Sequence, residues 1–114
     1  MTTWEELLPF HGQFNAIHNF FKRDPEVAAR YARYPKDVDI LQGRDVALTY
    51  NAFPWLLSPD IEHKVLWANR PLSVSEIEAC VPNGCIWFKN APQCQSRPDI
   101  WHCHVFIKIG RAHV

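Results

Sequence analysis

The residues best suited to chemistry in this sequence are two histidines, His102 and His104, in one short stretch near the C-terminus. They lie in the run from Ile100 to Ile109, which is rich in β-branched and aromatic residues and contains no Gly or Pro. This composition predicts a strand. Residues two apart on a strand share a face, with Cα atoms about 6.5 Å apart. Two imidazoles at this spacing can converge on one metal ion or one anion.

The opposite face of this predicted strand is wholly apolar. It carries Trp101, Cys103, Val105, Ile107 and Ile109, whereas the histidine face adds Ile100, Phe106 and Lys108. We therefore expect the apolar face to lie on the core.

Further candidate site residues lie on neighbouring segments. His63 is centred on the predicted strand from Ile61 to Trp67, whose alternation places His63, Val65 and Trp67 together. Asn90 begins the loop that leads into the histidine strand, and the other candidates for substrate contacts are Lys89, Ser96, Arg97 and Trp67. A histidine on an apolar strand face is also typical of a hydrogen-bonded core residue, so that alternative stays open.

Helices are predicted before these strands, and one further helix is predicted between the first and second of them. The Ser/Thr-x-x-Glu pattern of a capping box predicts helix starts at Thr3 and at Ser73, and Asp24 followed by Pro25 predicts a third. The predicted helices run from residue 4 to 9, 13 to 22, 25 to 33 and 73 to 80. Phe14, Ile17 and Phe21, at helical spacing, support the second of them.

Predicted strands over residues 61–67, 86–89 and 100–109 follow an aromatic segment, residues 46–57, that we expect to be irregular. This order predicts an α+β fold, in which N-terminal helices pack on a small, mostly antiparallel sheet. The 114 residues form one domain, with a helical part over residues 1–43 and a sheet part that carries the histidines over residues 44–114.

The charge balance limits the classes of partner. Twelve basic and twelve acidic residues cancel without a run of either sign, which disfavours nucleic acid and an anionic membrane surface as partners. The N-terminal residues lack the pattern of a signal peptide and no apolar run is long enough to span a bilayer, so we expect a cytoplasmic protein that acts on a small molecule. An exposed edge at the C-terminal strand would allow a homodimer.

The four cysteines do not form a recognisable metal-binding pattern. Cys80, Cys85, Cys94 and Cys103 show no C-x-x-C spacing, which disfavours a zinc site built on thiolates. We expect them to be reduced, with Cys103 buried as a small apolar residue.

Four segments carry a resemblance to a known family. They are T-W-E-E-L from Thr3, R-D-P-E-V-A-A-R-Y from Arg23, F-P-W-L-L-S-P-D-I-E-H-K-V-L-W from Phe53, and W-F-K-N with S-R-P-D-I-W-H-C-H-V-F from Trp87. In that order they resemble the domain-of-unknown-function family that includes the fungal N-acetylglucosamine-induced protein. The resemblance implies that His63, Asn90, His102 and His104 belong to the family pattern, but it implies no activity.

A fainter likeness links the chain to the histidine-triad nucleotide hydrolases and transferases. Their signature is three alternating histidines, of which the middle one attacks the α-phosphate. Here the flanking positions are Ile100 and Phe106, so only two histidines are present.

Three hypotheses for the chemistry follow. The first is a mononuclear enzyme site in which His63, His102 and His104 bind one divalent transition metal, zinc or iron, and leave a position open for substrate. The second is a metal-free hydrolase or transferase of a nucleotide or sugar phosphate, with His102 or His104 as nucleophile or general base and Asn90, Lys89, Ser96 or Arg97 as phosphate contacts. The third is a non-catalytic binding domain with a buried histidine network.

Overall fold

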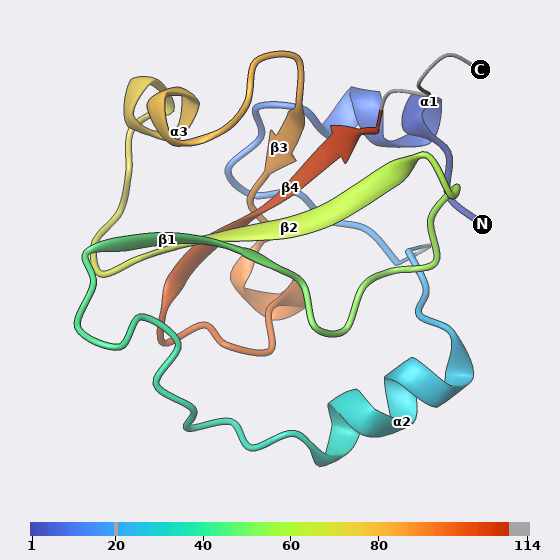
Figure 1. The fold of residues 1–114 in the computed structure, drawn as a ribbon, viewed down its shortest axis with the longest axis horizontal. Coiled ribbons are helices and arrows are strands. Elements are labelled where there is room, and N and C mark those ends of the chain that lie inside the picture. The colour runs from blue at the N-terminus through green and yellow to red at the C-terminus, as the bar shows by residue number, and fades with distance from the viewer. Residues whose placement is uncertain (20, 110–114) are drawn as a thin grey trace.

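The computed structural model of the chain describes residues 1–19 and 21–109 and contains a four-stranded sheet with short helices around it (Figure 1). The elements in chain order are α1 (Trp4–Leu7), the 3-10 helix η1 (Leu8–Phe10), α2 (Pro25–Arg33), β1 (Val46–Tyr50), β2 (Ile61–Ala68), α3 (Val74–Cys80), β3 (Ile86–Phe88), η2 (Pro92–Cys94) and β4 (Trp101–Lys108). The strand order is β1-β2-β4-β3, and every neighbouring pair is antiparallel. The predicted α+β class is confirmed. Within the described ranges, no helix has the length and apolarity to cross a bilayer.

The histidine strand β4 lies inside the sheet, between β2 and β3. Its register pairs His104 with Val65, His102 with Trp67, and Phe106 with His63. Residues directly opposite each other share a face, so all three histidines lie on one side of the sheet. The expectation of an exposed edge at this strand is wrong, because both of its edges are hydrogen-bonded to neighbours; a homodimer stays a prediction without this support.

The two faces of the sheet are covered by different parts of the chain. The apolar face, as we call it, presents Leu66, Trp87, Cys103 and Val105 and packs against Ile77 of α3. Cys103 is fully buried as expected, and burial raises the pKa of its thiol to about 12. Of the other residues expected on this face, Trp101 and Ile107 are half-buried and Ile109 is 47% exposed, so the prediction of a core position is wrong for Ile109.

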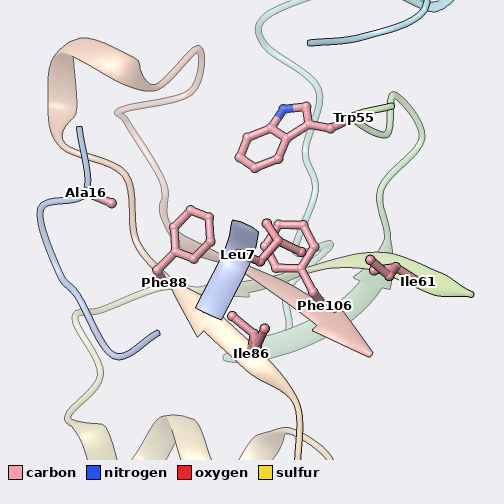
Figure 2. Packing of buried hydrophobic residues seen from close by; sticks show 7 residues of the cluster. All are labelled: Leu7, Ala16, Trp55, Ile61, Ile86, Phe88 and Phe106. Carbon is pink, nitrogen blue, oxygen red and sulfur yellow. The ribbon is translucent and has the colours of Figure 1, made fainter. Parts of the chain in front are cut away.

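The opposite side, the histidine face, is buried as well. Its apolar cluster joins side chains from β2, β3 and β4 to the N-terminal helices and to Trp55 of the β1–β2 loop (Figure 2); the members are Leu7, Ala16, Trp55, Ile61, Ile86, Phe88 and Phe106. Figure 2 shows Trp55 above the ring of Phe106, and their ring centroids are 5.6 Å apart. This cluster fills only the end of the face next to α1.

The capping residues act as the sequence predicts. Thr3 and Ser73 each form a complete capping box, with Glu6 and Glu76 respectively. Asp24 accepts a hydrogen bond from the backbone N–H of Glu26 at the start of α2. Figure 1 shows α2 and the residues after it as an arm that leaves the N-terminal segment, runs below the sheet and returns to β1.

Two predicted elements differ in the structure. Residues 46–50 form strand β1 instead of an irregular segment, because their backbone pairs with β2. The helix predicted over residues 13–22 is wrong: Ala16 forms a parallel bridge with Asn90, and Ala16 N–H and C=O bond to Lys89 and Ala91 at 2.9 Å each. The backbone groups of this segment bond to the edge of β3 and the residues after it, so they do not need the internal hydrogen bonds of a helix.

Candidate functional site

A cavity of about 720 Å³ lies on the histidine face, between the sheet and the arm that follows α2. Its floor is made by β1, β2 and β4, with Thr49, Val65, Trp67, His102 and His104. Residues 34–36 and 38–40 of the arm and residues 93–97 of the β3–β4 loop form walls. The volume falls within the range of about 300–1,000 Å³ that small-molecule pockets occupy.

His102 presents one nitrogen to this pocket with a defined protonation. Its Nδ1 is 2.9 Å from the carbonyl oxygen of Ile100, and because a carbonyl can only accept, Nδ1 carries the proton. Burial lowers the pKa of His102, which favours a neutral ring at neutral pH. Nε2 is therefore an unprotonated nitrogen, and among the described residues it has no hydrogen-bond partner.

A chain of hydrogen bonds holds His104 in the tautomer opposite to that of His102. The Trp55 backbone N–H donates to Nδ1 of His63 over 3.2 Å, so the proton of the neutral His63 ring is on Nε2. That Nε2 lies 2.8 Å from Nδ1 of His104 and donates to it, which places the proton of His104 on Nε2. Burial lowers the pKa of His63 to about 3 and that of His104 well below its ordinary value, so both rings are neutral.

A second contact of His63 is weaker. The Asn51 side-chain nitrogen lies 3.3 Å from Nε2 of His63, but a protonated Nε2 cannot accept from it. The orientation of the Asn51 amide is set instead by its oxygen, which accepts the Phe53 backbone N–H at 2.8 Å. The shorter bond to His104 therefore decides where the His63 proton points.

Asn90 is fixed beside the pocket by contacts at both ends. Its side-chain oxygen accepts from Nε2 of His18 at 2.9 Å, and its carbonyl accepts from the Gln95 side chain at 2.7 Å. The remaining amide N–H group is the part of this buried side chain that is open to a ligand in the pocket. Burial lowers the pKa of His18, which keeps it a neutral donor.

The structure brings most of the sequence-predicted site residues together. Asn90, His102, His104, Trp67, Ser96 and Arg97 all line the cavity. His63 lies behind His104, and Lys89 is outside the lining residues. Arg97 makes a bidentate pair with Asp99, with both distances 3.0 Å, and donates to the Val38 carbonyl at 3.1 Å, so it ties the arm to the β3–β4 loop.

Sequence reasoning missed three pocket residues. His18, Arg23 and Trp55 are not among the candidates that the sequence indicates, yet all three line the cavity. His18 meets Asn90 across 72 positions of sequence, a separation at which spacing carries no signal. For Arg23 the only local sign was its place next to the Asp-Pro helix start.

The three histidines do not have the arrangement of a mononuclear metal site. His63 and His104 point ring nitrogens at each other, and the outer nitrogen of His63 is taken by a backbone N–H. His102 bonds to its own strand, and its ring centroid is 6.1 Å from that of His104. In the described part of the chain, no group of three or more His, Cys, Asp or Glu residues could hold a metal ion.

Comparison with known proteins gives one relative by sequence. No family model matches the chain. It is 27% identical over 99 residues to N-acetylglucosamine-induced protein 1 of Candida albicans (strain SC5314 / ATCC MYA-2876). The two proteins are distantly related. The match covers 66% of this chain and 39% of that protein, so the chain corresponds to well under half of its relative.

A solved structure shares the fold. The crystal structure of HTC1 superposes with a TM-score of 0.65 over 100% of this chain and 89% of the other, at 18% sequence identity. Identity this low supports the fold alone. The likeness to histidine-triad hydrolases stays a sequence-based prediction that neither comparison supports.

Proposed function

We propose that the chain binds a small molecule in this pocket and carries out metal-free proton-transfer chemistry on it, in the class of hydrolysis or group transfer. One observation carries the proposal: two neutral imidazoles, two residues apart on β4, present opposite polar atoms. His102 offers a bare Nε2, and His104 offers an Nε2–H fixed by His63.

The two rings fit complementary roles in one reaction. A neutral imidazole with an exposed lone pair can take a proton from water or a substrate hydroxyl, or attack an electrophilic centre itself, so we assign His102 as general base or nucleophile. The His104 N–H and the Asn90 amide can hydrogen-bond an oxygen that gains negative charge in the transition state. Because burial opposes protonation of His104, it acts as a donor of a hydrogen bond and not as a cation.

His63 is a positioning residue in this scheme. It touches His104 and not the pocket, and its hydrogen bond selects which nitrogen of His104 carries the proton. The Trp55 N–H in turn selects the His63 tautomer, so a backbone group determines the polarity of the site.

The proposal differs from the metal-dependent enzyme favoured by the sequence. With His63 and His104 bonded to each other, zinc or iron bound by the three histidines would first have to separate them, and no reaction step is assigned to a metal here. The two other hypotheses, a histidine-dependent hydrolase or transferase and a non-catalytic binding domain, both use this pocket.

The tautomers themselves can be measured. Ring ¹⁵N and ¹³C NMR of the protein at pH 7 should show His102 protonated on Nδ1 and His63 and His104 protonated on Nε2, all neutral. If His102 and His104 proved to have the same tautomer, or if either were charged, the assignment of roles would fail.

Activity can be tested with two matched variants. His102→Asn keeps a donor for the Ile100 carbonyl, and His104→Asn keeps an acceptor for His63, so each removes mainly the pocket nitrogen. On a panel of chromogenic carboxylate and phosphate esters, we expect EDTA-resistant turnover that falls by roughly 10²-fold or more in His102→Asn. Turnover that survives both substitutions, or is lost with EDTA, would contradict the proposal; saturable binding of pocket ligands without turnover would favour the non-catalytic reading.

A further inference from the structure

Arg23 is a half-buried cation in the pocket wall that lacks an acidic partner. None of the carboxylates in the described residues lies within 4.0 Å of its guanidinium. The group that raises its pKa is the side chain of Tyr31, through a coulombic interaction and a hydrogen bond, and no carboxylate is among the groups that shift it. Burial is the main influence on Arg23 and lowers its pKa, which means that its charge is held at a cost in free energy.

The contacts of Arg23 fix the guanidinium without neutralising it. Its Nε donates to the Phe53 carbonyl at 2.8 Å, and the guanidinium carbon lies 4.0 Å from the ring centroid of Tyr31. The terminal nitrogens form the end of the fork, the geometry that binds carboxylate and phosphate oxygens in pairs. Its positive charge contributes to lowering the pKa of both His63 and His104.

The other half-buried arginine of the described chain provides a comparison. Arg97 also lines the cavity, but Asp99 pairs with it through two hydrogen bonds. Of the remaining charged lining residues, Lys36 stacks on the Tyr31 ring and Asp39 accepts the Gln42 backbone N–H at 3.0 Å. If Asp99 is counted with Arg97, three cations and two carboxylates leave a surplus of one positive charge, and Arg23 is the half-buried cation without a carboxylate partner.

Much of the pocket lining is aromatic. Tyr31, Tyr34, Phe53, Trp55 and Trp67 line the cavity together with Phe21. Aromatic side chains of this number bind flat, apolar bodies well, since stacking and edge contacts each add to the area buried.

We infer that Arg23 binds the anionic group of the substrate, and that the substrate is a small molecule with a planar apolar body and a carboxylate or phosphate. This inference rests on the proposed function of the pocket and names the class of its ligand. A carboxylate and a phosphate ester present the same pair of oxygens to a guanidinium, so the experiment has one arm for each.

The test compares benzoate, phenyl phosphate and neutral benzamide, titrated into the protein and followed by ¹H–¹⁵N NMR. We expect at least one anion to bind about tenfold or more tightly than benzamide. Arg23→Gln should remove that preference while benzamide affinity stays unchanged, and Arg23→Lys should restore part of it. Arg33→Gln, an exposed change at the last residue of α2, should behave like the parent protein.

Three results would overturn the assignment. They are benzamide binding as tightly as both anions, an anion preference that persists in Arg23→Gln, and no saturable binding of either anion. If Arg23 served only to hold the arm in place, Arg23→Gln would lower the melting temperature without changing the preference for anions. If benzoate and phenyl phosphate bind equally well, Arg23 recognises the pair of oxygens that both anions present.

The same titrations separate this inference from the proposed function. Loss of anion preference in Arg23→Gln, with the ring signals of His102 and His104 unmoved by ligand, would support the anion site and count against the acid–base site. If benzamide binding shifts the ring signals of both histidines and Arg23→Gln changes nothing, the result would support the acid–base site and count against the anion site.

Discussion

The two faces of β4 are both buried, yet they do different work. On the apolar face, Cys103 and Val105 are fully buried among side chains of β2, β3 and α3. On the histidine face, His102 and His104 are each 7% exposed and border a cavity. Alternate residues of one strand thus contribute either to dry packing or to a hydrogen-bonded site.

The difference shows where this protein places its polar groups. On the histidine face, the Trp55 backbone N–H bonds to one ring nitrogen of His63, and the other ring nitrogen of His63 bonds to His104. On the apolar face, the Trp87 indole nitrogen is, within the described residues, the buried side-chain nitrogen or oxygen that has no partner. The apolar face therefore leaves the Trp87 indole nitrogen unsatisfied, whereas the hydrogen bonds on the histidine face fix the tautomers of His63 and His104.

The largest expected effect separates the two faces by stability. Leu66 is fully buried on the apolar face, so Leu66→Ala should lower the free energy of unfolding by about 2–5 kcal/mol. The next residue, Val65, borders the cavity, and Val65→Ala should cost only about 1.5 kcal/mol for two lost carbons. Urea unfolding measures both; equal losses would mean that the cavity does not relieve packing on the histidine face.

Acid should weaken the histidine face selectively. The folded pKa of His63 is about 3, below the ordinary value of 6.5, so between these values the unfolded chain binds a proton that the folded chain does not. The free energy of unfolding should therefore fall by about 2 kcal/mol for His63 alone from pH 7 to pH 5. Arg23 faces both His63 and His104, and His18 and His102 also face His104, so protonation there meets further positive charge.

A substitution checks the origin of this pH dependence. His63→Asn retains an acceptor for the Trp55 N–H but cannot be protonated, so urea unfolding across the same pH range should give a flatter profile. An unchanged profile in the variant would assign the acid sensitivity to other groups.

A smaller effect is expected where the arm contacts the β3–β4 loop. Arg97 has a side chain only 11% exposed and links Asp99 to the Val38 carbonyl. Arg97→Gln should cost about 1–2 kcal/mol and speed amide exchange in the arm, measured by hydrogen–deuterium exchange. The exposed pair between Arg70 and Glu76, at 2.7 Å, is the control, and Arg70→Gln should leave the free energy of unfolding nearly unchanged.

The smallest expected effect concerns metal. Because the three histidines are bonded to other groups, EDTA should leave the melting temperature unchanged, and elemental analysis should find no stoichiometric zinc or iron. About one metal per chain, absent from a His102→Ala, His104→Ala double variant, would restore the three-histidine metal site.

Local sequence features predicted the elements that depend on local physics. The capping residues Thr3, Asp24 and Ser73 mark helix starts because their side chains bond to N–H groups two or three residues away. The alternation in β4 likewise separated the histidines from the apolar residues. Those features need no partner from elsewhere in the chain.

Features that depend on distant partners were missed. Phe14, Ile17 and Phe21 fit a helix by spacing, but the backbone of this segment pairs with β3, and Ile17 is 66% exposed. The sequence also placed three histidines on one face correctly, yet it could not show that His63 bonds to His104 instead of to a shared ion. That depends on ring orientations set by the Trp55 N–H.

The parallel pairing of residues 12–16 with the β3 edge has a consequence for the order of assembly. During synthesis at about 5–20 residues per second, His18 emerges roughly 4–14 s before Asn90, its partner 72 positions later. Throughout that interval the backbone of this segment must stay hydrated, because the edge that it joins has not been made. The complete sheet and the pocket can therefore form only after β3 and β4, which end at Lys108, have been synthesised.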